Sequence, residues 1–227
     1  MTTVLHRTAL SVAGLVAAGG VAAGGVVAGP AAAAQAAAAS DTARSAADAA
    51  SSDRGGWSSE GRLLNTRYER QPNFYYCGPA ATRIALTAQG RELSQYEVAS
   101  RLGTTMAGTD SAEDTTRVLN EFTGDDEYRT TAIEASKASQ VQIDQLRADV
   151  RATVDDGRAV VANIIGTVSD VDGRTHSYPG GHYVTVVGYG EGGDAVKIAD
   201  PAFLGAEHYW VSTETLAHWI ATRGYSH

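Results

Sequence analysis

Cysteine is nearly absent from this sequence, which contains a single one, Cys77. A lone cysteine has no partner for a disulfide bond within the chain. It also argues against a structural zinc site, because one cysteine and dispersed histidines do not give the ligand spacing of such sites. An N-terminal lipid would need a cysteine at a signal cleavage site, which this chain lacks. Packing or chemistry therefore remains as the reason for Cys77.

Basic residues are also in short supply. The chain has 18 Lys and Arg against 26 Asp and Glu, which gives a formal net charge of −8. Loss of an N-terminal segment that contains Arg7 would make the rest more negative still. Nucleic acids and anionic membranes repel such a protein. We therefore expect neither as a partner.

Residues 1–36 contain no acidic side chain. His6 and Arg7 precede a long uncharged run of Val, Leu, Ala and Gly, and small residues around Gln35 offer cleavage sites. A charged start, an apolar middle and a small-residue exit are typical of a secretory signal peptide. An uncleaved membrane anchor is the alternative, but the Gly-rich run packs poorly as a helix. The sequence thus predicts a secreted protein without a membrane segment after cleavage.

Residues 37–60 consist mainly of Ala, Ser, Asp, Thr and Gly. They offer no apolar stripe to bury, so we expect a disordered leader or linker. Residues 61–227 show no internal repeat and suit one globular domain, since the chain is 43% hydrophobic. We expect this domain to be a monomer.

The front half of the domain has helical periodicity. Apolar residues recur at helical spacing from Cys77 to Gln89, and Pro79 suits a first helical turn. Ser94 and Glu97 have the spacing of a capping box. The other predicted helices are "TDSAEDTTRVLNEFTG" (109–124) and the stretch striped by Ile143, Leu146, Val150 and Val154.

The back half changes to segments rich in β-branched residues, which favour strands. We predict strands at 158–165, 182–190, 195–200 and 206–212, followed by a closing helix near "TETLAHWI". Helices followed by an antiparallel sheet indicate an α+β fold.

Cys77 lies where the first predicted helix begins, in "QPNFYYCGPAATRIAL". The positive end of the helix dipole stabilises a thiolate and lowers the thiol pKa from about 8.5. A thiolate is the nucleophilic form of cysteine. The alternative is that Cys77 is a small buried hydrophobic residue, which is the usual role of a free cysteine.

A thiolate nucleophile needs a general base, usually a histidine held by a third group. His182 stands at the head of the strand "HYVTVVGYG". If that strand turns back through residues 191–193 onto "AVKIAD", Asp200 becomes a direct or diagonal neighbour of His182. A carboxylate there would orient the imidazole. Taken singly, each residue is better explained as a solvent-bonded strand-end histidine or as a turn cap before Pro201.

Gln71 precedes Cys77 by six residues. Acyl transfer needs hydrogen-bond donors directed at the developing oxyanion. The Gln71 amide and the backbone N–H of Cys77 would supply them. A lone loop glutamine is usually solvated, so this assignment depends on the spacing to the cysteine.

That spacing introduces a resemblance to a known family. "Q-x5-CGPA" opening a helix, then "GHYVTVVGY", then "ADPA", resembles the papain-like cysteine peptidases, specifically those similar to the bacterial double-glycine leader, or bacteriocin-processing, peptidases. The resemblance runs from about Leu64 to the C-terminus.

The resemblance implies Cys77 as nucleophile, His182 as general base and acid, Asp200 as the orienting residue and Gln71 in the oxyanion hole. It also implies a papain-like fold, with a helical lobe that bears the cysteine, a sheet lobe that bears the histidine, and a peptide or protein substrate in the cleft between them. No cofactor and no metal is implied. Aromatic candidates to line the cleft are Tyr75, Tyr76, Tyr178 and Trp210.

Two features depart from the family pattern. Tyr76 stands where the leader peptidases more often have an acidic residue, and those enzymes are commonly fused to a membrane exporter. The leader-peptide substrate is therefore not carried over. We expect an exported cysteine peptidase that works through an acyl-enzyme. The alternatives are a cell-wall (peptidoglycan) amidase or endopeptidase with the same triad, and a catalytically inactive papain-like binding module.

Overall fold

The computed structural model describes residues 61–124, 126–202 and 205–227. The signal peptide predicted for residues 1–36 and the linker predicted for residues 37–60 lie outside the described residues. Within the described part of the chain, no helix combines the length and the apolar composition needed to cross a membrane. The elements are β1 (Arg62–Leu63), α2 (Cys77–Ala88), α3 (Gln95–Leu102), α4 (Ala112–Thr123), β2 (Thr130–Ile133), α5 (Gln140–Asp155), β3 (Val160–Ser169), β4 (Thr175–Gly190), the 3₁₀ turn η1 (Glu191–Gly193), β5 (Ala195–Ala199), β6 (His208–Ser212), α6 (Thr213–Ile220) and β7 (Arg223–Ser226).

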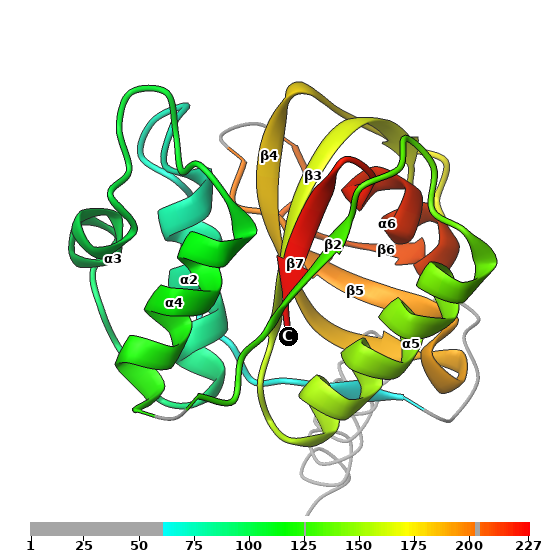
Figure 1. The fold of residues 1–227 in the computed structure, drawn as a ribbon, viewed down its shortest axis with the longest axis horizontal. Coiled ribbons are helices and arrows are strands. Elements are labelled where there is room, and N and C mark those ends of the chain that lie inside the picture. The colour runs from blue at the N-terminus through cyan, green and yellow to red at the C-terminus, as the bar shows by residue number, and fades with distance from the viewer. Residues whose placement is uncertain (1–60, 125, 203–204) are drawn as a thin grey trace, which may run out of the picture. The chain divides into compact units, whose positions relative to one another are not determined.

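Helices α2, α3 and α4 form a helical lobe, on the left of Figure 1. Ser94 and Glu97 make the reciprocal capping box that begins α3, and Ser111 caps α4. Both helices end at a glycine in the left-handed conformation, Gly103 and Gly124. The helices predicted in this part of the sequence are confirmed.

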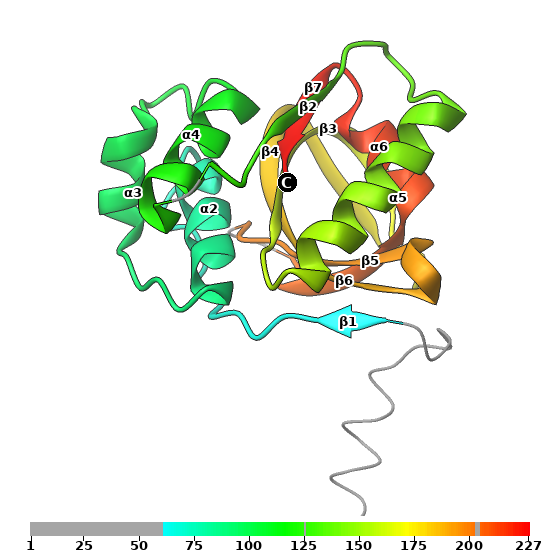
Figure 2. The ribbon, with the colours of Figure 1, turned by 60° about the horizontal axis from the view of Figure 1, so that its bottom comes forward.

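The sheet lobe is antiparallel throughout, with the strand order β2-β7-β3-β4-β5-β6, while β1 pairs with β4. Figure 2 shows β1 as a short strand on the stretch of chain that leads into the helical lobe. The sequence predicted β3, β4, β5 and β6 but not the short β1, β2 and β7. Strands β2 and β7 pair with each other although they lie far apart in the sequence. Each therefore depends on a partner that local periodicity does not reveal. The expected α+β order of a helical lobe followed by a sheet lobe is confirmed.

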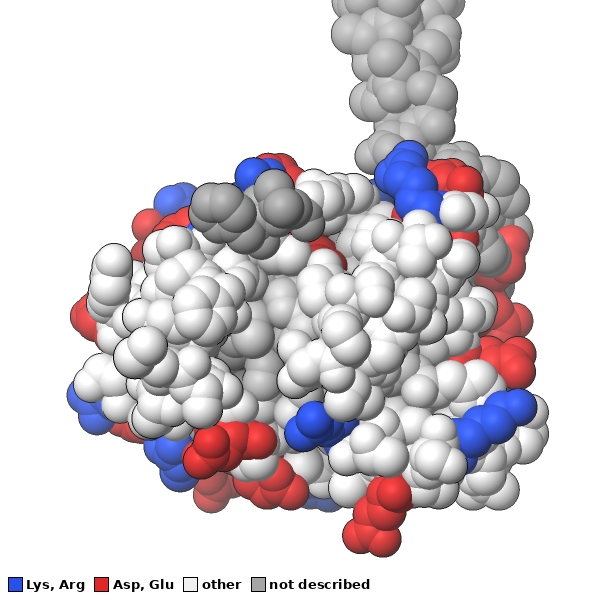
Figure 3. Space-filling view, turned by 90° about the horizontal axis from the view of Figure 1, so that it is seen from above, with Lys and Arg blue, Asp and Glu red and all other residues white. Residues whose placement is uncertain are grey.

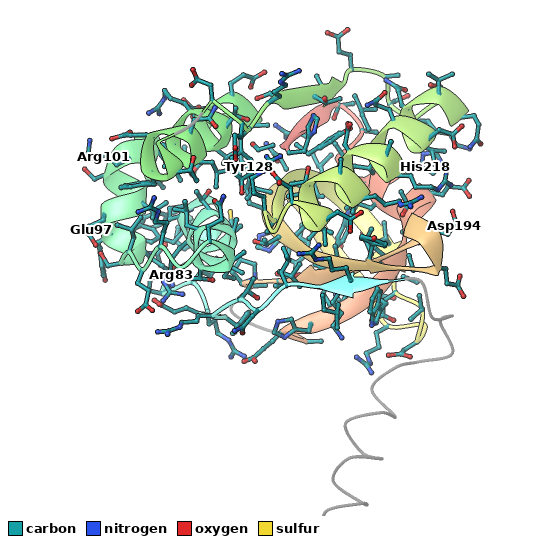
Figure 4. All side chains as sticks on the ribbon, turned by 90° about the horizontal axis from the view of Figure 1, so that it is seen from below. Arg83, Glu97, Arg101, Tyr128, Asp194 and His218 are labelled. Carbon is teal, nitrogen blue, oxygen red and sulfur yellow. The ribbon has the colours of Figure 1, made fainter. Side chains whose placement is uncertain are left out.

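The sheet is covered on both faces, because side chains of a strand alternate between its faces. On β3, Val160 and Ala162 join the core formed with α5 and α6, whereas Val161 joins the core formed with α2, α3 and α4. Tyr128 is buried on the helical side, with the guanidinium carbon of Arg158 5.0 Å from its ring centroid. Figure 4 shows Tyr128 where the two lobes meet. The sheet therefore contributes side chains to both cores, and this packing fixes the helical lobe against the strands.

Strand β4 begins earlier than the sequence predicts. It was expected to start at His182 but starts at Thr175 and passes through a bulge. Ile164 of β3 pairs with His182, and Gly166 pairs with Tyr178, so residues 179–181 of β4 lie opposite the single residue Ile165 of β3. Proline and glycine hide a strand from pattern analysis because both are rare in regular strands. Bulges re-aim neighbouring side chains, and this one lies directly before His182.

Candidate active site

Cys77 is the first residue of α2, as predicted, and its side chain is buried. Tyr76 precedes the helix without capping it by a side-chain hydrogen bond. Among the described residues, none accepts a hydrogen bond from the backbone N–H of Cys77. Gly78 follows because a Cβ at this position would overlap the side chain of Thr109. The thiol thus lies at the start of α2, against the loop that leads to α4.

His182 and Asp200 meet through the β4–β5 hairpin. The strands turn through η1, and the last pair in register is Thr185 with Ala199. This register makes Asp200 a diagonal neighbour of His182, and His182 Nε2 lies 2.7 Å from Asp200 Oδ1. The hairpin predicted from the sequence is confirmed. Both side chains are buried, with 5% of His182 and 1% of Asp200 exposed.

The Asp200 carboxylate receives four hydrogen bonds. His182 and the backbone N–H of Ala202 donate to Oδ1, at 2.7 and 2.9 Å. The hydroxyls of Tyr178 and Tyr209 each donate to Oδ2, at 2.7 Å. Neither tyrosine contact was predicted from the sequence. The only local signal was that Tyr178 and His182 flank the Pro-Gly-Gly segment of one strand, which does not specify a hydrogen bond.

The three ionisable groups of the site shift one another's pKa values. Burial alone would raise the pKa of the Cys77 thiol, but the hydrogen bond and charge of His182, with backbone N–H groups of Tyr183 and Gly78, lower it overall. Burial would lower the pKa of His182, yet hydrogen bonds and charges from Asp200 and Cys77 raise it to about 9. These shifts favour a thiolate beside an imidazolium at neutral pH.

Asp200 completes the charge pattern. Burial would raise the pKa of its carboxyl, but the hydrogen bond and charge of His182 and the hydroxyls of Tyr209 and Tyr178 lower it overall. Asp200 thus stays ionised and accepts all four hydrogen bonds. Because Nε2 of His182 is engaged by Asp200, Nδ1 is the ring nitrogen left for Cys77.

Gln71 is buried on the segment that precedes α2, with 5% exposure. Its backbone N–H donates to the carbonyl of Pro201, at 2.9 Å, which ties this segment to the residue after Asp200. One side-chain N–H donates to the carbonyl of Asn73, at 2.7 Å, and the amide group has a second N–H. The amide oxygen is buried and has no partner among the described residues. Gln71 is therefore not the solvated loop residue of the alternative interpretation.

Two cavities meet at His182. One, of about 170 Å³, is lined by Cys77, His182 and the loop 107–110. The other, of about 530 Å³, is lined by Gln71, Phe74, Tyr178 and His182. Of the four aromatic residues proposed for the cleft, Tyr178 lines a cavity, whereas Tyr75, Tyr76 and Trp210 line neither. The loop before α4 and the β3–β4 hairpin both lie at the top of Figure 1, and Figure 3 looks down on a largely uncharged face hollowed between the lobes.

A second histidine–carboxylate pair lies beside the larger cavity. His176 Nε2 is 2.9 Å from Asp170 Oδ2, and the His176 ring stacks on Tyr209 with centroids 3.7 Å apart. His176 therefore packs on the ring of the tyrosine whose hydroxyl donates to Asp200. No cluster of three or more metal-binding side chains occurs among the described residues.

Comparisons with known proteins bear on the family and the fold of the chain. The model of the Peptidase_C39 like family matches residues 63–227. The crystal structure of a C39-like peptidase from Bacillus anthracis aligns with a TM-score of 0.50 at 15% identity, covering 74% of this chain and 97% of that chain. The papain-like fold predicted from the sequence, and the resemblance to this peptidase family, are confirmed.

Two further structures are also similar. The peptidase domain of Streptococcus ComA, a bifunctional ABC transporter of a quorum sensing pathway, has a TM-score of 0.46 at 17% identity and covers 73% of this chain and 96% of that chain. A double glycine motif protease from an AMS/PCAT transporter, in complex with the leader peptide, has a TM-score of 0.45 at 14% identity and covers 74% and 93%. No curated protein shows significant similarity to the chain.

Proposed function

This chain belongs to the Peptidase_C39 like family, and we propose that it is a cysteine peptidase that hydrolyses peptide bonds through Cys77, His182 and Asp200. The observation that carries the proposal is the 2.7 Å contact between His182 Nε2 and Asp200 Oδ1 beside a thiol of lowered pKa. A buried cysteine that served only in packing would have no use for a charged histidine held by a carboxylate.

The chemistry follows from the charges of the site. The Cys77 thiolate attacks the carbonyl carbon of the scissile bond, and the C=O electron pair moves onto oxygen. The tetrahedral intermediate collapses as Nδ1–H of His182 gives its proton to the leaving amine, which leaves a thioester on Cys77. His182 then takes a proton from water, whose oxygen attacks the thioester carbon and releases the carboxylic acid and the thiolate. Asp200 keeps the imidazole oriented throughout.

Gln71 and the start of α2 would stabilise the oxyanion. The backbone N–H of Cys77 has no acceptor among the described residues, and the Gln71 amide has one N–H beyond that given to Asn73. Two donors fixed before the reaction cost no reorganisation when charge develops. Their burial strengthens each hydrogen bond relative to one in water.

The proposal includes export, which depends on residues 1–36. Their charged start, apolar middle and small-residue exit support removal as a signal peptide. Mass spectrometry of the N-terminus, on protein from the medium and from cells, tests this point. We expect a chain that starts near residue 37 in the medium. Full-length protein retained in the membrane fraction would contradict export.

The peptidase proposal is tested by digesting a proteome-derived peptide library with the reduced protein and identifying new termini by mass spectrometry. Cys77→Ala should abolish every cleavage while the thermal midpoint stays nearly unchanged, because only a sulfur atom is removed. Cleavage by this variant would remove Cys77 as the nucleophile.

A parallel digestion of purified peptidoglycan tests the alternative that the protein is a cell-wall amidase or endopeptidase. Release of muropeptides without cleavage of the peptide library would move the substrate to cross-linked wall peptides. If neither substrate is cut and iodoacetamide does not modify Cys77 in the folded protein, the binding-module interpretation replaces the proposal.

A further inference from the structure

Arg223 forms no ion pair with a carboxylate in the part of the chain that the structure describes, although acidic residues line the cavities beside it. It is the first residue of β7 and is partly buried, and its Nε is buried without a hydrogen-bond partner among the described residues. A guanidinium has five N–H donors and is costly to bury unpaired. Most other described arginines pair with a carboxylate: Arg67, Arg70, Arg83, Arg101, Arg117, Arg147, Arg158 and Arg174.

Arg223 lies close to the candidate active site. Arg223 lines the smaller cavity together with Cys77 and His182. One terminal nitrogen of its guanidinium comes within 3.6 Å of the point where a Cβ on Gly181 would lie. Gly181 directly precedes His182 in the bulge of β4. The unpaired cation therefore lies in the same groove as the candidate nucleophile.

The residue before Arg223 has an unfavourable backbone conformation, which fixes where the Arg223 side chain leaves the chain. Thr222 has φ 67°, in the left-handed region that β-branched residues rarely adopt. Its N–H donates to the carbonyl of Ile133, at 2.7 Å, and also to that of Ala135, at 3.1 Å. Such strain persists only where the surroundings enforce it, and it clusters at ligand sites.

The neighbouring strands leave room for the side chain. Pairing between β7 and β3 covers only Val161 with Ser226 and Ala162 with Tyr225. Beyond Ala162 the two strands separate, at the end of β7 where Arg223 lies. The guanidinium and the carbonyl of Ile164 lie 3.6 and 3.7 Å from the position that a Cβ on Gly181 would take, and Arg223 lines the smaller cavity there.

We infer that Arg223 binds a carboxylate of the peptide substrate, an aspartate or glutamate side chain close to the scissile bond. The inference rests on the proposed peptidase function for the identity of the substrate. A planar guanidinium matches a carboxylate with paired hydrogen bonds, which no neutral side chain equals.

Acidic residues around the groove restrict what binds. Asp110 lines both the smaller cavity and an adjoining one, which Glu113, Glu134 and Arg223 also line. Their carboxylates disfavour further negative charge, because like charges interact unfavourably. The groove thus selects one acidic side chain at Arg223 and disfavours a run of acidic residues.

The test uses alkylation of Cys77, which needs no turnover. Iodoacetate and N-iodoacetylglycine carry a carboxylate at two distances from the reactive carbon, and their amides are neutral matches. The measured quantity is the ratio of carboxylate to amide rates, which cancels differences in thiolate content between variants. Arg223→Gln should lower this ratio about two- to fivefold for at least one reagent pair, and Arg223→Lys should keep part of it.

Arg174→Gln is the matched control. Arg174 lines the larger cavity and pairs with Asp172, at 3.0 Å, so the ratio should not change. An Arg223→Gln ratio equal to that of the parent protein overturns the inference. If Arg223→Gln does not fold, Asp110→Asn takes its place and should raise the ratio, because it removes a competing charge from the groove. An unchanged ratio in that variant also overturns the inference.

Peptide pairs separate this inference from the peptidase proposal. Peptides cut by the parent protein are remade with Glu or Gln at each position around the cleaved bond. A Glu preference at one position that Arg223→Gln removes supports both proposals. Cleavage without any such preference overturns the carboxylate site alone. An Arg223-dependent alkylation ratio in a protein that cuts no peptide overturns the peptidase proposal alone.

Discussion

The ring of Tyr178 lies flat on the imidazole of His182, with centroids 4.0 Å apart and planes inclined by 21°. The hydroxyl of the same tyrosine donates to Asp200 Oδ2, while His182 bonds Oδ1. Tyr178 therefore restrains the imidazole twice, directly by stacking and indirectly by fixing the carboxylate. The ring of Tyr178 also lies near that of Trp219 of α6, with ring centroids 5.9 Å apart. The candidate catalytic histidine is thus held by the core of the sheet lobe.

Removing one hydrogen-bond donor to the Asp200 carboxylate should shift the pH dependence of activity. Tyr209→Phe deletes a hydroxyl that lies 2.7 Å from Asp200 Oδ2 and helps to keep the carboxyl pKa low. The pKa of Asp200 should rise, so the acid limb of the kcat/KM profile should move to higher pH. Stability should fall by about 1.5 to 3 kcal/mol, as for a hydrogen bond to a charged group.

Tyr225→Phe is the control for this prediction. Tyr225 is also buried and donates to a carboxylate oxygen, Asp149 Oδ2, at 2.7 Å, in the core away from Asp200. It should lose similar stability with no movement of the acid limb. Equal pH profiles for Tyr209→Phe and the parent protein would show that Tyr209 only contributes to packing.

The rate of Cys77 alkylation by iodoacetamide should report the paired charges. The thiolate is the reacting form, and a lowered pKa means that the reaction reaches a plateau at a pH below the usual thiol range. A second rise in the alkylation rate should appear near pH 9, where His182 loses its proton and no longer stabilises the thiolate by its charge. Peptide hydrolysis should instead decline there, because the neutral imidazole has no proton for the leaving amine.

His182→Ala removes both features from the alkylation profile. Burial then dominates at Cys77 and raises the thiol pKa, so a single rise at higher pH should remain. An unchanged profile in this variant would mean that the imidazole does not set the state of the thiol, and the search for the base would move to His176.

Gln71→Ala should slow hydrolysis without preventing binding. Loss of an oxyanion donor costs about 2 to 4 kcal/mol in the transition state, or roughly 30- to 10³-fold in kcat. Gln95→Ala is a matched control, because Gln95 is a second buried glutamine whose amide donates to the carbonyl of Arg70, at 2.9 Å. It should cost stability but little kcat. Equal kcat losses in the two variants would assign Gln71 a structural role.

Gly78→Ala should disturb the loop that borders Cys77. The added Cβ would overlap the Thr109 side chain, and overpacking of this kind costs about 1 to 3 kcal/mol of stability. Gly180→Ala is the comparison, since a Cβ there meets nothing within 4 Å. Thermal unfolding of both variants is the measurement. A Gly78→Ala midpoint equal to that of Gly180→Ala would show that the loop yields freely.

Local signals in the sequence identified most elements of the fold. Each predicted helix has its stripe and most have a polar cap, as Ser94 with Glu97 at α3. These features depend on residues a few positions apart, so they can be recognised from the sequence alone. The N-terminal part of β4 was missed because its Pro-Gly-Gly bulge disrupts periodicity, and β7 was missed because its partners, β2 and β3, lie far away in the sequence.

The features of the candidate site also divide into those that local sequence predicts and those that only the tertiary structure shows. Sequence alone determined that Cys77 begins a helix and that a hairpin makes Asp200 a neighbour of His182, since both are consequences of local spacing. Only the tertiary structure decided that two tyrosines share the other Asp200 oxygen and that Arg223 enters the groove beside Cys77. Those contacts join residues from separate strands and loops. Their geometry is set by the twist, the bulge and the packing of the whole sheet, which no short stretch of sequence encodes.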